Sequence, residues 1–339
     1  MDDPVPGHYG TLMAIARGYQ RSQALAVAAE LGVADLLADG PRPAADLAAA
    51  TGTHPDALYR LLRALAAIGV FAEHDDRRFS LTAMGELLRR DHPHSLDPAV
   101  RMFCAGYEWR AWGELGHSIR TGESAARQAL GTDIWEYRRR HPEEAEVFDA
   151  AMRTMAASYA DAILAAHDFG RYGVVAGVGG GTGVLLAAIL RAHPGVRGVL
   201  AEQPHVLERA PAVLEAAGVA DRVKLVGCDF FAAVPSGADA YVLLRVLHDW
   251  SDGDALTILR RVRQALPASA RLLVVDGVVG PPGEDALTKF LDLMMLVSAG
   301  GRERTEDEWT ALLGDAGFAV EAVVPAGPGR SVMEAVPVG

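Results

Sequence analysis

The chain has 339 residues, of which half are hydrophobic and 22% are charged, so it is long and apolar enough to build more than one core. Its formal net charge of −12 argues against a protein that holds nucleic acid through a basic surface. Cys104 and Cys228 are too few for a disulfide framework, and the acidic N-terminus lacks the hydrophobic core of a signal peptide. We therefore expect a cytoplasmic protein.

The first ninety residues are predicted to form a helical module that ends in a β-hairpin. Residues 11–40 have apolar side chains at helical spacing and are interpreted as a helix. The segment 40–43, "GPRP", is interpreted as a turn, and 44–70 as a helix, a turn and a second helix. In 71–82, "FAEHDDRRFSLT", two phenylalanines flank a charged tip, which is typical of a hairpin. The order of these elements is that of a winged helix.

A winged helix raises the possibility of DNA binding. The helix that would enter the groove, residues 56–69, carries only Arg60 and Arg63 as basic side chains. Residues 20–90 hold eight arginines against nine acidic residues, so the charge needed to neutralise phosphates is missing. Packing or dimerisation is the favoured interpretation, and binding of nucleic acid is not expected.

Residues 101–165 are predicted to be helical and contain many large side chains. Phe148, Met152 and Met155 share one helix face because they follow the i, i+4, i+7 spacing. From spacing alone, this face is either an interdomain core or the wall of an apolar ligand pocket.

Strand and helix signals alternate after Tyr172, and this predicts an α/β domain. Continuous apolar strands separated by helices are typical of a parallel sheet covered on both faces. Two further strands, 318–326 and 331–338, lack a helix between them and are expected to form an antiparallel pair at the sheet edge. The expected parallel strands are 172–178, 196–202, 222–229, 238–244 and 271–279, and the helices between them are 183–194, 204–218 and 252–267.

The uncharged run between Arg171 and Arg191 is long enough for a membrane helix. Its central glycines exclude that interpretation, because each glycine costs roughly 1 kcal/mol in a helix interior. A buried strand, a glycine turn and a buried helix explain the run instead. No membrane association is expected.

The glycine turn has the spacing Gly177-x-Gly179-x-Gly181-x-Gly183, which does not match the dinucleotide fingerprint G-x-G-x-x-G. Glycines after a parallel strand let the backbone approach a ligand closely, and the amides at the start of the next helix point at that ligand.

The next two strands end in residues that suit a nucleoside. Glu202 can accept hydrogen bonds from ribose hydroxyls, although a solvated acid at a strand end is equally plausible at this stage. Asp229 can accept from an adenine amino group, and Phe230 offers an apolar wall for the ring.

Four motifs occur in a fixed order along the chain: "EQP" (202–204), "GCDFF" (227–231), "VLHDWSD" (246–252) and "GGRERTEDEW" (300–309). With the helical N-terminal region, they resemble the S-adenosylmethionine-dependent O-methyltransferases of the plant caffeate and bacterial polyketide type. The resemblance covers essentially the whole chain, and the last two motifs are its most specific part. It implies a Rossmann-like methyltransferase domain at 166–339, a winged-helix dimerisation domain at 1–100, a helical connector at 101–165, and a homodimer.

The resemblance also implies roles for individual residues. His248 corresponds to the family's general base, and Asp276 and Glu303 to the acids beside it. S-adenosyl-L-methionine is the implied cofactor and an aromatic or polyketide-like small molecule the implied acceptor. The implied cofactor-binding residues are Gly179, Gly181, Gly183, Glu202, Asp229, Phe230 and Arg245, and the implied acceptor-binding residues are Trp112, Phe148, Met152, Met155, Asp292 and Met295.

The chemistry of methyl transfer suits these residue types. A phenol with a pKa near 10 is mostly protonated at pH 7, and a histidine can remove its proton as the oxygen attacks. Flanking acids fix the histidine tautomer and stabilise the imidazolium. No metal is required, and His92 and His94 in a polar loop are interpreted as solvated side chains rather than metal ligands.

The sequence departs from the pattern of this family in three ways. Gly177 stands where the family usually has an acid that helps hold the ammonium group of the cofactor. Leu244 and Arg245 stand where a polar side chain is frequent, and Arg245 either replaces that contact or faces solvent. Asp276 is one methylene shorter than the usual Glu, so we expect it to reach His248 through water rather than directly.

Two other functions remain open at this stage. Some relatives keep the fold and the cofactor but perform hydroxylation, decarboxylation or pericyclic chemistry; His248 argues against such a change and Gly177 mildly for it. A ligand-responsive DNA-binding protein is the third and least favoured hypothesis, because of the acidic N-terminal half.

Overall fold

The computed structural model describes residues 5–338, and the chain divides into two compact units. Unit 1 contains the residues up to Trp109 together with Glu143–Thr154, and unit 2 contains Arg110–Pro142 together with the residues from Met155 onward. The three-part division with boundaries at residues 100 and 165 stays a prediction.

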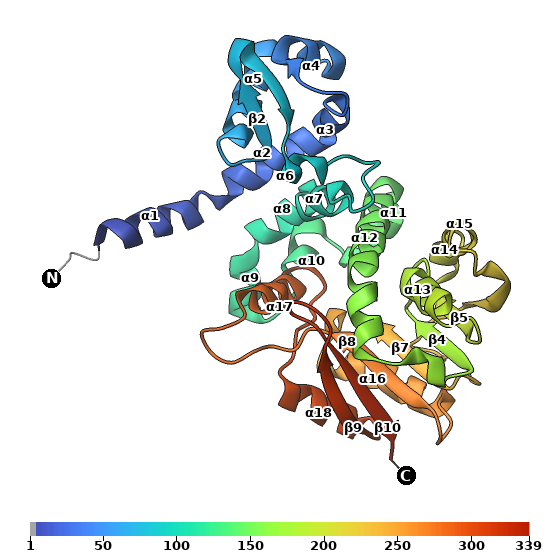
Figure 1. The fold of residues 1–339 in the computed structure, drawn as a ribbon. Coiled ribbons are helices and arrows are strands. Elements are labelled where there is room, and N and C mark those ends of the chain that lie inside the picture. The colour runs from blue at the N-terminus through green and yellow to red at the C-terminus, as the bar shows by residue number, and fades with distance from the viewer. Residues whose placement is uncertain (1–4, 339) are drawn as a thin grey trace. The chain divides into compact units, whose positions relative to one another are not determined.

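Unit 1 contains the predicted helix–turn–helix and hairpin (Figure 1). The side chains of Leu47, Leu62, Phe71 and Phe79, drawn from both helices and both strands, are buried in one core. Its elements are α1 (Val5–Ala16), α2 (Gly18–Glu30), α3 (Val33–Leu36), β1 (Arg42–Pro43), α4 (Ala44–Thr51), α5 (Pro55–Ala66), β2 (Phe71–His74), β3 (Arg78–Leu81), α6 (Ala83–Glu86) and α7 (Asp97–Phe103).

Two predictions for this unit were wrong. Residues 11–40 do not form one helix, because the backbone leaves helical geometry at Arg17 (φ −98°, ψ 6°) and Gly32 takes a left-handed φ of 63°, which ends a helix. The segment 40–43 is not only a turn: Arg42 and Pro43 pair with Phe79 and Arg78, and so add a third strand to the hairpin. Apolar periodicity did not reveal either feature.

Unit 2 is built on a seven-stranded sheet with the order β6-β5-β4-β7-β8-β10-β9. The first five strands of this order are parallel, and β10 and β9 are antiparallel at the edge. This confirms the predicted fold class. Its elements are α8 (Gly106–Gly113), which begins in unit 1, α9 (Leu115–Thr121), α10 (Ala125–Leu130), α11 (Ile134–Arg140), α12 (Pro142–Ala166), which crosses both units, β4 (Val174–Val178), α13 (Val184–Ala192), β5 (Arg197–Glu202), α14 (Pro204–Leu207), α15 (Ala210–Ala216), β6 (Val223–Gly227), β7 (Ala240–Leu244), α16 (Asp252–Ala265), β8 (Arg271–Asp276), α17 (Ala286–Ser298), α18 (Glu306–Asp315), β9 (Phe318–Pro325) and β10 (Ser331–Pro337).

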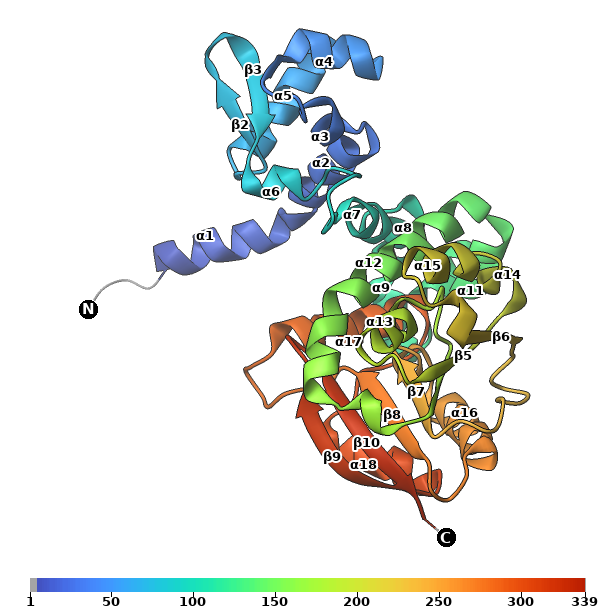
Figure 2. The same ribbon diagram turned by 45° about the vertical axis from the view of Figure 1, so that its right-hand side comes forward.

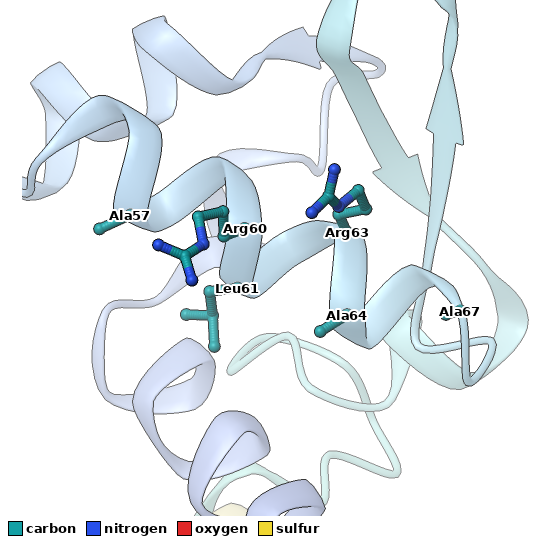
Figure 3. A pocket seen from close by; sticks show the side chains of 6 residues that line it. All are labelled: Ala57, Arg60, Leu61, Arg63, Ala64 and Ala67. Atoms are coloured by element: carbon teal, nitrogen blue, oxygen red, sulfur yellow. The ribbon is translucent and has the colours of Figure 1, made fainter.

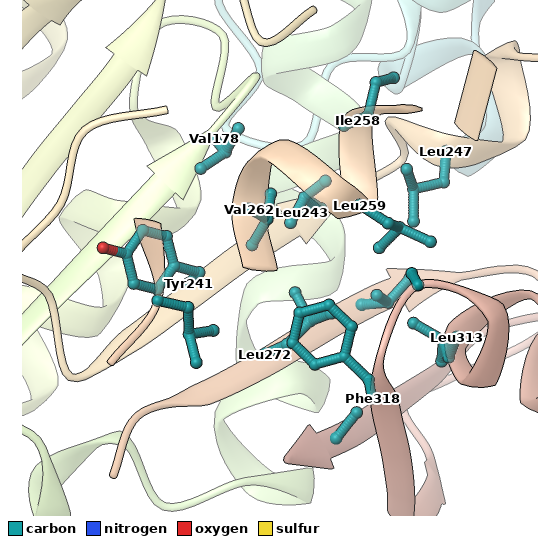
Figure 4. Packing of buried hydrophobic residues seen from close by; sticks show 14 of the residues in the cluster. Val178, Tyr241, Leu243, Leu247, Ile258, Leu259, Val262, Leu272, Leu313 and Phe318 are labelled. Atoms are coloured by element: carbon teal, nitrogen blue, oxygen red, sulfur yellow. The ribbon is translucent and has the colours of Figure 1, made fainter. Parts of the chain in front are cut away.

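Helices cover both faces of the sheet (Figure 2). Because side chains alternate along a strand, Tyr241 and Leu243 of β7 pack with α16 and α18 on one face. Val242 packs with α13 and the end of α12 on the other. Figure 4 shows the first of these cores, where Leu259 and Val262 of α16 lie over the strands.

One predicted helix of unit 2 is interrupted. Residues 204–218 form the two short helices α14 and α15 instead of one. Pro211 explains the break, because its ring cannot coexist with a regular helical turn before it and it has no N–H to donate. Among the residues described, no helix is both long and apolar enough to span a membrane, and the cytoplasmic location stays a prediction.

Candidate active site

The predicted site residues follow the carboxyl ends of neighbouring strands. From β4, the chain first adds β5 and β6 on one side and then returns to add β7 and β8 on the other. In open α/β sheets, ligands bind outside the carboxyl ends of the strands at such a reversal. Gly179 follows β4, Glu202 ends β5, Asp229 follows β6, Arg245 follows β7 and Asp276 ends β8.

The turn after β4 requires glycine for two different reasons. Gly179 and Gly181 have φ values of 63° and 57°, a region that costs other residues roughly 1–2 kcal/mol. A Cβ atom on Gly179 would also lie 2.8 Å from Cγ2 of Val246, whereas one on Gly181 would meet nothing within 4 Å. The turn is therefore packed against the protein at Gly179 and open at Gly181.

Glu202 is bound to the glycine turn. Its Oε2 accepts a hydrogen bond from the Gly181 amide at 2.9 Å, and its Oε1 accepts one from the Gln203 amide at 2.7 Å. Burial raises the pKa of Glu202, although these two amides act in the opposite direction. Each oxygen keeps acceptor capacity for a further donor, so Glu202 can order the turn and bind a ligand hydroxyl at once.

Aromatic rings lie beside the turn. Cε1 of Phe230 is 3.4 Å from the position that a Cβ on Gly179 would take. The Phe230 ring meets the Trp250 ring edge-on, with centroids 6.0 Å apart. Asp229 is exposed and accepts a hydrogen bond from the Phe231 amide at 3.0 Å. An apolar wall with an acid at its edge suits an adenine ring.

His248 lies in a short 3₁₀ turn between β7 and α16 and is only 2% exposed. Its Nδ1 is 2.5 Å from Oε1 of Glu303 and 3.7 Å from Oδ1 of Asp276. Its Nε2 is 3.7 Å from Oδ1 of Asp249. Because Glu303 holds Nδ1, Nε2 is the nitrogen left to exchange a proton with a ligand.

The acids around His248 set its charge. Burial alone lowers the pKa of an imidazole, but the charges of Asp276, Asp249 and Glu303 outweigh it and raise the pKa of His248 to about 8. Burial raises the pKa of Asp276 to about 7, while the imidazolium opposes this change. The histidine and Asp276 therefore titrate as an interacting pair.

Asp276 does not reach His248 by a direct hydrogen bond. Its side chain is fully buried, and neither carboxylate oxygen has a hydrogen-bond partner among the residues described. The 3.7 Å separation is too long for a hydrogen bond, in line with its short side chain. Asp276 acts on His248 through its charge.

The segment 301–304 places Glu303. A Cβ on Gly301 would lie 2.1 Å from the carbonyl oxygen of His248, so only glycine allows this segment to approach. The Arg302 amide then donates to that carbonyl at 2.9 Å, and Oδ1 of Asp292 accepts from the Glu303 amide at 2.9 Å. Asp292, predicted to bind the acceptor, here fixes the backbone of Glu303.

Arg304 is a residue that the sequence analysis missed. It is 1% exposed, and its guanidinium donates to the carbonyls of Leu247 and Trp250, on both sides of His248, at 3.2 and 3.1 Å. It also pairs with Asp252 at 2.8 Å and lies over the Trp309 ring. The motifs "VLHDWSD" and "GGRERTEDEW" thus contact each other through Arg304. Their order in the sequence alone did not reveal this contact.

Arg245 has an unusual backbone and an unsatisfied side chain. It is one of four non-glycine residues with positive φ among those described, at 53°, and its Nε is buried without a hydrogen-bond partner. Its positive charge opposes the raised pKa values of Asp249 and Asp276. The side chain is half-buried near these acids and is not simply directed to solvent.

The predicted acceptor residues are not all brought together in one unit. Met155 and Met295 are buried in unit 2. Trp112 packs against a small cluster that includes Val297 of α17. Phe148 and Met152 lie with Met155 on α12 but belong to unit 1, so their role stays a prediction.

A shallow groove on α5 in unit 1 carries none of the predicted site residues. Figure 3 shows that it lies along one side of the helix for which DNA binding was considered. It contributes only two charges, both from arginine. Its lining residues are Ala57, Arg60, Leu61, Arg63, Ala64 and Ala67.

Comparison with known proteins identifies the family. An O-methyltransferase domain matches residues 112–319, and an O-methyltransferase dimerisation domain matches residues 13–91. The chain belongs to the O-methyltransferase family. It is 43% identical to a phenazine O-methyltransferase of Lysobacter antibioticus, over 96% of each chain. It also matches the crystal structure of an O-methyltransferase from neocarzinostatin biosynthesis in complex with S-adenosylmethionine and 2-hydroxy-5-methyl naphthoic acid, with a TM-score of 0.81 and 36% identity, over 94% of this chain and 96% of the other.

The relatives differ in reaction. An 8-amino-8-demethylriboflavin N,N-dimethyltransferase of Streptomyces davaonensis is 42% identical over 98% of each chain. Aclacinomycin 10-hydroxylase of Streptomyces purpurascens is 38% identical, over 88% of this chain and 81% of the other. The family therefore fixes the cofactor, S-adenosyl-L-methionine, and the methyltransferase class more firmly than the acceptor atom.

The geometry of the site fits this cofactor. The open face at Gly181, the spare acceptor capacity of Glu202 and the apolar wall at Phe230 would hold a nucleoside. The unpartnered Nε of Arg245 lies at the neighbouring strand end and suits the carboxylate of an amino-acid moiety. A Cβ on Gly177 would have only ordinary van der Waals neighbours, so packing does not explain the absence of an acid there.

Proposed function

We propose that this protein transfers the methyl group of S-adenosylmethionine to a hydroxyl of an aromatic or polyketide-like small molecule, with His248 as the general base. The observation that carries this proposal is the orientation of the buried imidazole. Glu303 holds Nδ1 at 2.5 Å, which leaves Nε2 for the proton of the acceptor hydroxyl.

The chain supplies a base matched to its task. Bound S-adenosylmethionine supplies an electrophilic methyl group, and a phenol oxygen attacks it well only as its proton leaves. A base with a pKa of about 8 removes a proton from a phenol near pKa 10 more readily than an ordinary histidine would. Asp276 and Glu303 stabilise the imidazolium that forms, because both lie on its Nδ1 side.

Other residues bind and orient the reactants. The glycine turn lets the protein backbone come close to the cofactor at Gly179, Gly181 and Gly183. The remaining cofactor contacts are assigned to Glu202, Asp229, Phe230 and Arg245. Trp112, Phe148, Met152, Met155, Asp292 and Met295 are assigned to the acceptor. The relatives that act on a phenazine and on a naphthoate support a flat aromatic acceptor. Alignment of oxygen and methyl group supplies much of the remaining rate enhancement.

The test is methyl transfer from labelled cofactor to a panel of phenols by the wild type and by His248→Asn. We expect the variant to lose roughly 10²–10⁴-fold in kcat while its affinity for S-adenosylhomocysteine stays within about threefold of the wild type. His94→Asn, which changes an exposed histidine of unit 1, is the matched control. Unchanged turnover in His248→Asn would remove the base assignment.

Hydroxylation is the second candidate function, because a relative of 38% identity carries that name. Product mass separates the two reactions: a gain of one CH₂ supports methyl transfer, and a gain of one oxygen atom supports hydroxylation. Identical assays with an aromatic amine would show whether nitrogen is also accepted.

We also propose a homodimer formed through the dimerisation domain. Large apolar side chains are exposed along α1 and the start of α2: Tyr9, Leu12, Ile15 and Tyr19 are 54–71% exposed. Such a surface on a single chain marks an interaction site. Sedimentation equilibrium is expected to give twice the chain mass for the wild type, and Leu12→Glu with Ile15→Glu is expected to weaken the association.

A further inference from the structure

Two arginines at the Asp276 end of the sheet have no anionic partner within 4 Å among the residues that the structure describes. Arg330 precedes β10, whose first residue, Ser331, pairs with Asp276 of β8. Arg245 follows β7, the neighbour of β8 on the other side. All of these residues belong to unit 2. The sheet register therefore brings two guanidinium groups to the strand ends that carry the proposed site.

Arg330 is held in place by its surroundings. The Ala326 amide donates to the carbonyl of Arg330 at 2.9 Å, which closes the hairpin turn. The guanidinium lies over the ring of Tyr159 on α12, with Cζ 3.3 Å from the ring centroid. Tyr159 comes one helical turn after Met155, so Arg330 contacts α12 next to the residues that are assigned to the acceptor.

No described carboxylate pairs with either guanidinium within 4 Å. The Nε of Arg245 is buried and has no hydrogen-bond partner. Burial lowers the pKa of Arg330, and the positive charge of Arg245 lowers it further. Tyr159 and Asp276 oppose this change. Buried charges are normally paired, and two partly buried guanidinium groups at the ends of the strands that flank β8 call for an anion.

The acids nearby do not supply that anion. Glu303 is engaged with His248, and Asp276 lies 3.7 Å from the imidazole. Asp249 is likewise 3.7 Å from Nε2 of His248. The three acids lie closest to the imidazole, and none of them is within 4 Å of either guanidinium. Each guanidinium therefore keeps donors for a group from outside the chain.

We propose that Arg330 and Arg245 together form a carboxylate-binding pair beside His248, with Arg330 seated on Tyr159. The pair takes the carboxylate of the methionine moiety of the cofactor or a carboxylate on the aromatic ring of the acceptor. The guanidinium fork matches a carboxylate in either case. This inference rests on the proposed function, since it concerns ligands of the same site.

The test uses Arg330→Gln and Arg330→Lys in the full-length protein, with Arg197→Gln, an exposed arginine at the start of β5, as the control. In the first arm, calorimetry measures binding of S-adenosylhomocysteine and of 5′-methylthioadenosine, which lacks the amino-acid moiety. In the second arm, kcat/KM is measured for a hydroxybenzoate and for the matching phenol without the carboxylate.

We expect Arg330→Gln to weaken the carboxylate-bearing ligand by about tenfold or more in one arm, with Arg330→Lys intermediate and the carboxylate-free ligand within about threefold of the wild type. Loss in the first arm assigns the methionine carboxylate, and loss in the second assigns the acceptor carboxylate. Loss in neither arm, or equal loss for the carboxylate-free ligands, overturns the proposal. If Arg330→Gln does not fold, the affinities and kcat/KM values for ligands with and without the carboxylate are compared in Arg330→Lys instead. Normal binding of S-adenosylhomocysteine by the wild type keeps a failure of this inference distinct from a failure of the proposed function.

Discussion

The two halves of the site are built in opposite ways. At the glycine turn, the polar groups satisfy one another: Glu202 accepts hydrogen bonds from Gly181 and Gln203. Around His248, buried polar atoms are left without hydrogen bonds, namely both oxygens of Asp276 and Oε2 of Glu303. The first half is shaped by backbone conformation, whereas the second depends on charges that the rest of the fold holds in place.

This difference has an energetic consequence. A buried carboxylate without hydrogen bonds costs several kcal/mol. The carboxylates around His248 are therefore tolerated only because the imidazolium opposes their charge and because packing fixes the segments that carry them. Arg304 binds the carbonyls on both sides of His248, and Gly301 lies against the His248 carbonyl. The proposed catalytic function and the structural cost coincide in this half, and the following changes separate them.

Among changes to the residues that support His248, Glu303→Gln is expected to have the largest effect on activity. The change keeps the shape of the side chain but removes the charge at 2.5 Å from Nδ1, so the imidazolium loses its closest support and the tautomer is no longer fixed. We expect kcat to fall by on the order of 10²-fold, with binding of S-adenosylhomocysteine unchanged. Glu321→Gln, on an exposed part of β9, is the control. Full activity of Glu303→Gln would show that the charge of Glu303 does not act on the base.

Two substitutions, Gly179→Ala and Gly181→Ala, test the half of the site at the glycine turn, because the first should lower stability and the second ligand affinity. Gly179→Ala combines a left-handed φ with a Cβ at 2.8 Å from Val246, so we expect a loss of roughly 2–4 kcal/mol in the free energy of unfolding. Gly181→Ala meets no neighbour and should lose only about 1 kcal/mol.

Because the open side of the turn is where the ligand is proposed to lie, Gly181→Ala should instead weaken binding of S-adenosylhomocysteine. Urea denaturation and calorimetry on the same preparations measure the two quantities. Equal stability losses in the two variants would contradict the distinction between a packed and an open side of the turn.

The pH dependence gives the smallest effect and the finest test. His248 acts as a base only when unprotonated, and its pKa is raised to about 8, so kcat/KM should rise about tenfold per pH unit below that value and level off above it. Asp276→Asn removes one of the charges that raise this pKa, so the midpoint should move to lower pH. A midpoint that stays in place would show that Asp276 does not act on the base through its charge.

The same pKa shift predicts a contribution to stability. A histidine whose pKa is raised on folding, here from 6.5 to about 8, stabilises the folded state fully below its unfolded value. That contribution is lost as the pH rises through about 8. The difference in unfolding free energy between wild type and His248→Asn should therefore shrink between pH 6.5 and pH 8.5, as measured by urea denaturation at each pH.

Local patterns in the sequence predicted most of the α/β domain. The apolar runs at β4, β5 and β7 are buried on both faces of the sheet, and the glycine turn lies where the spacing placed it. Prediction failed where a helix is interrupted by one residue within an otherwise apolar helical pattern, as at Gly32 and Pro211. It also failed for β1, whose pairing partners, Arg78 and Phe79, lie beyond two intervening helices and a strand.

The sequence by itself determined the family, the cofactor and the identity of the candidate base, because ordered motifs and strand-end residues are local properties of the chain. Only the tertiary structure decided how these residues are arranged and which of them contact one another. Asp292 supports Glu303 rather than merely lining a pocket, Asp276 influences His248 without a hydrogen bond, and Arg304 ties two distant motifs together. These relations depend on distances between segments far apart in sequence, and on the burial that raises the pKa of Asp276 to about 7, neither of which a linear pattern contains.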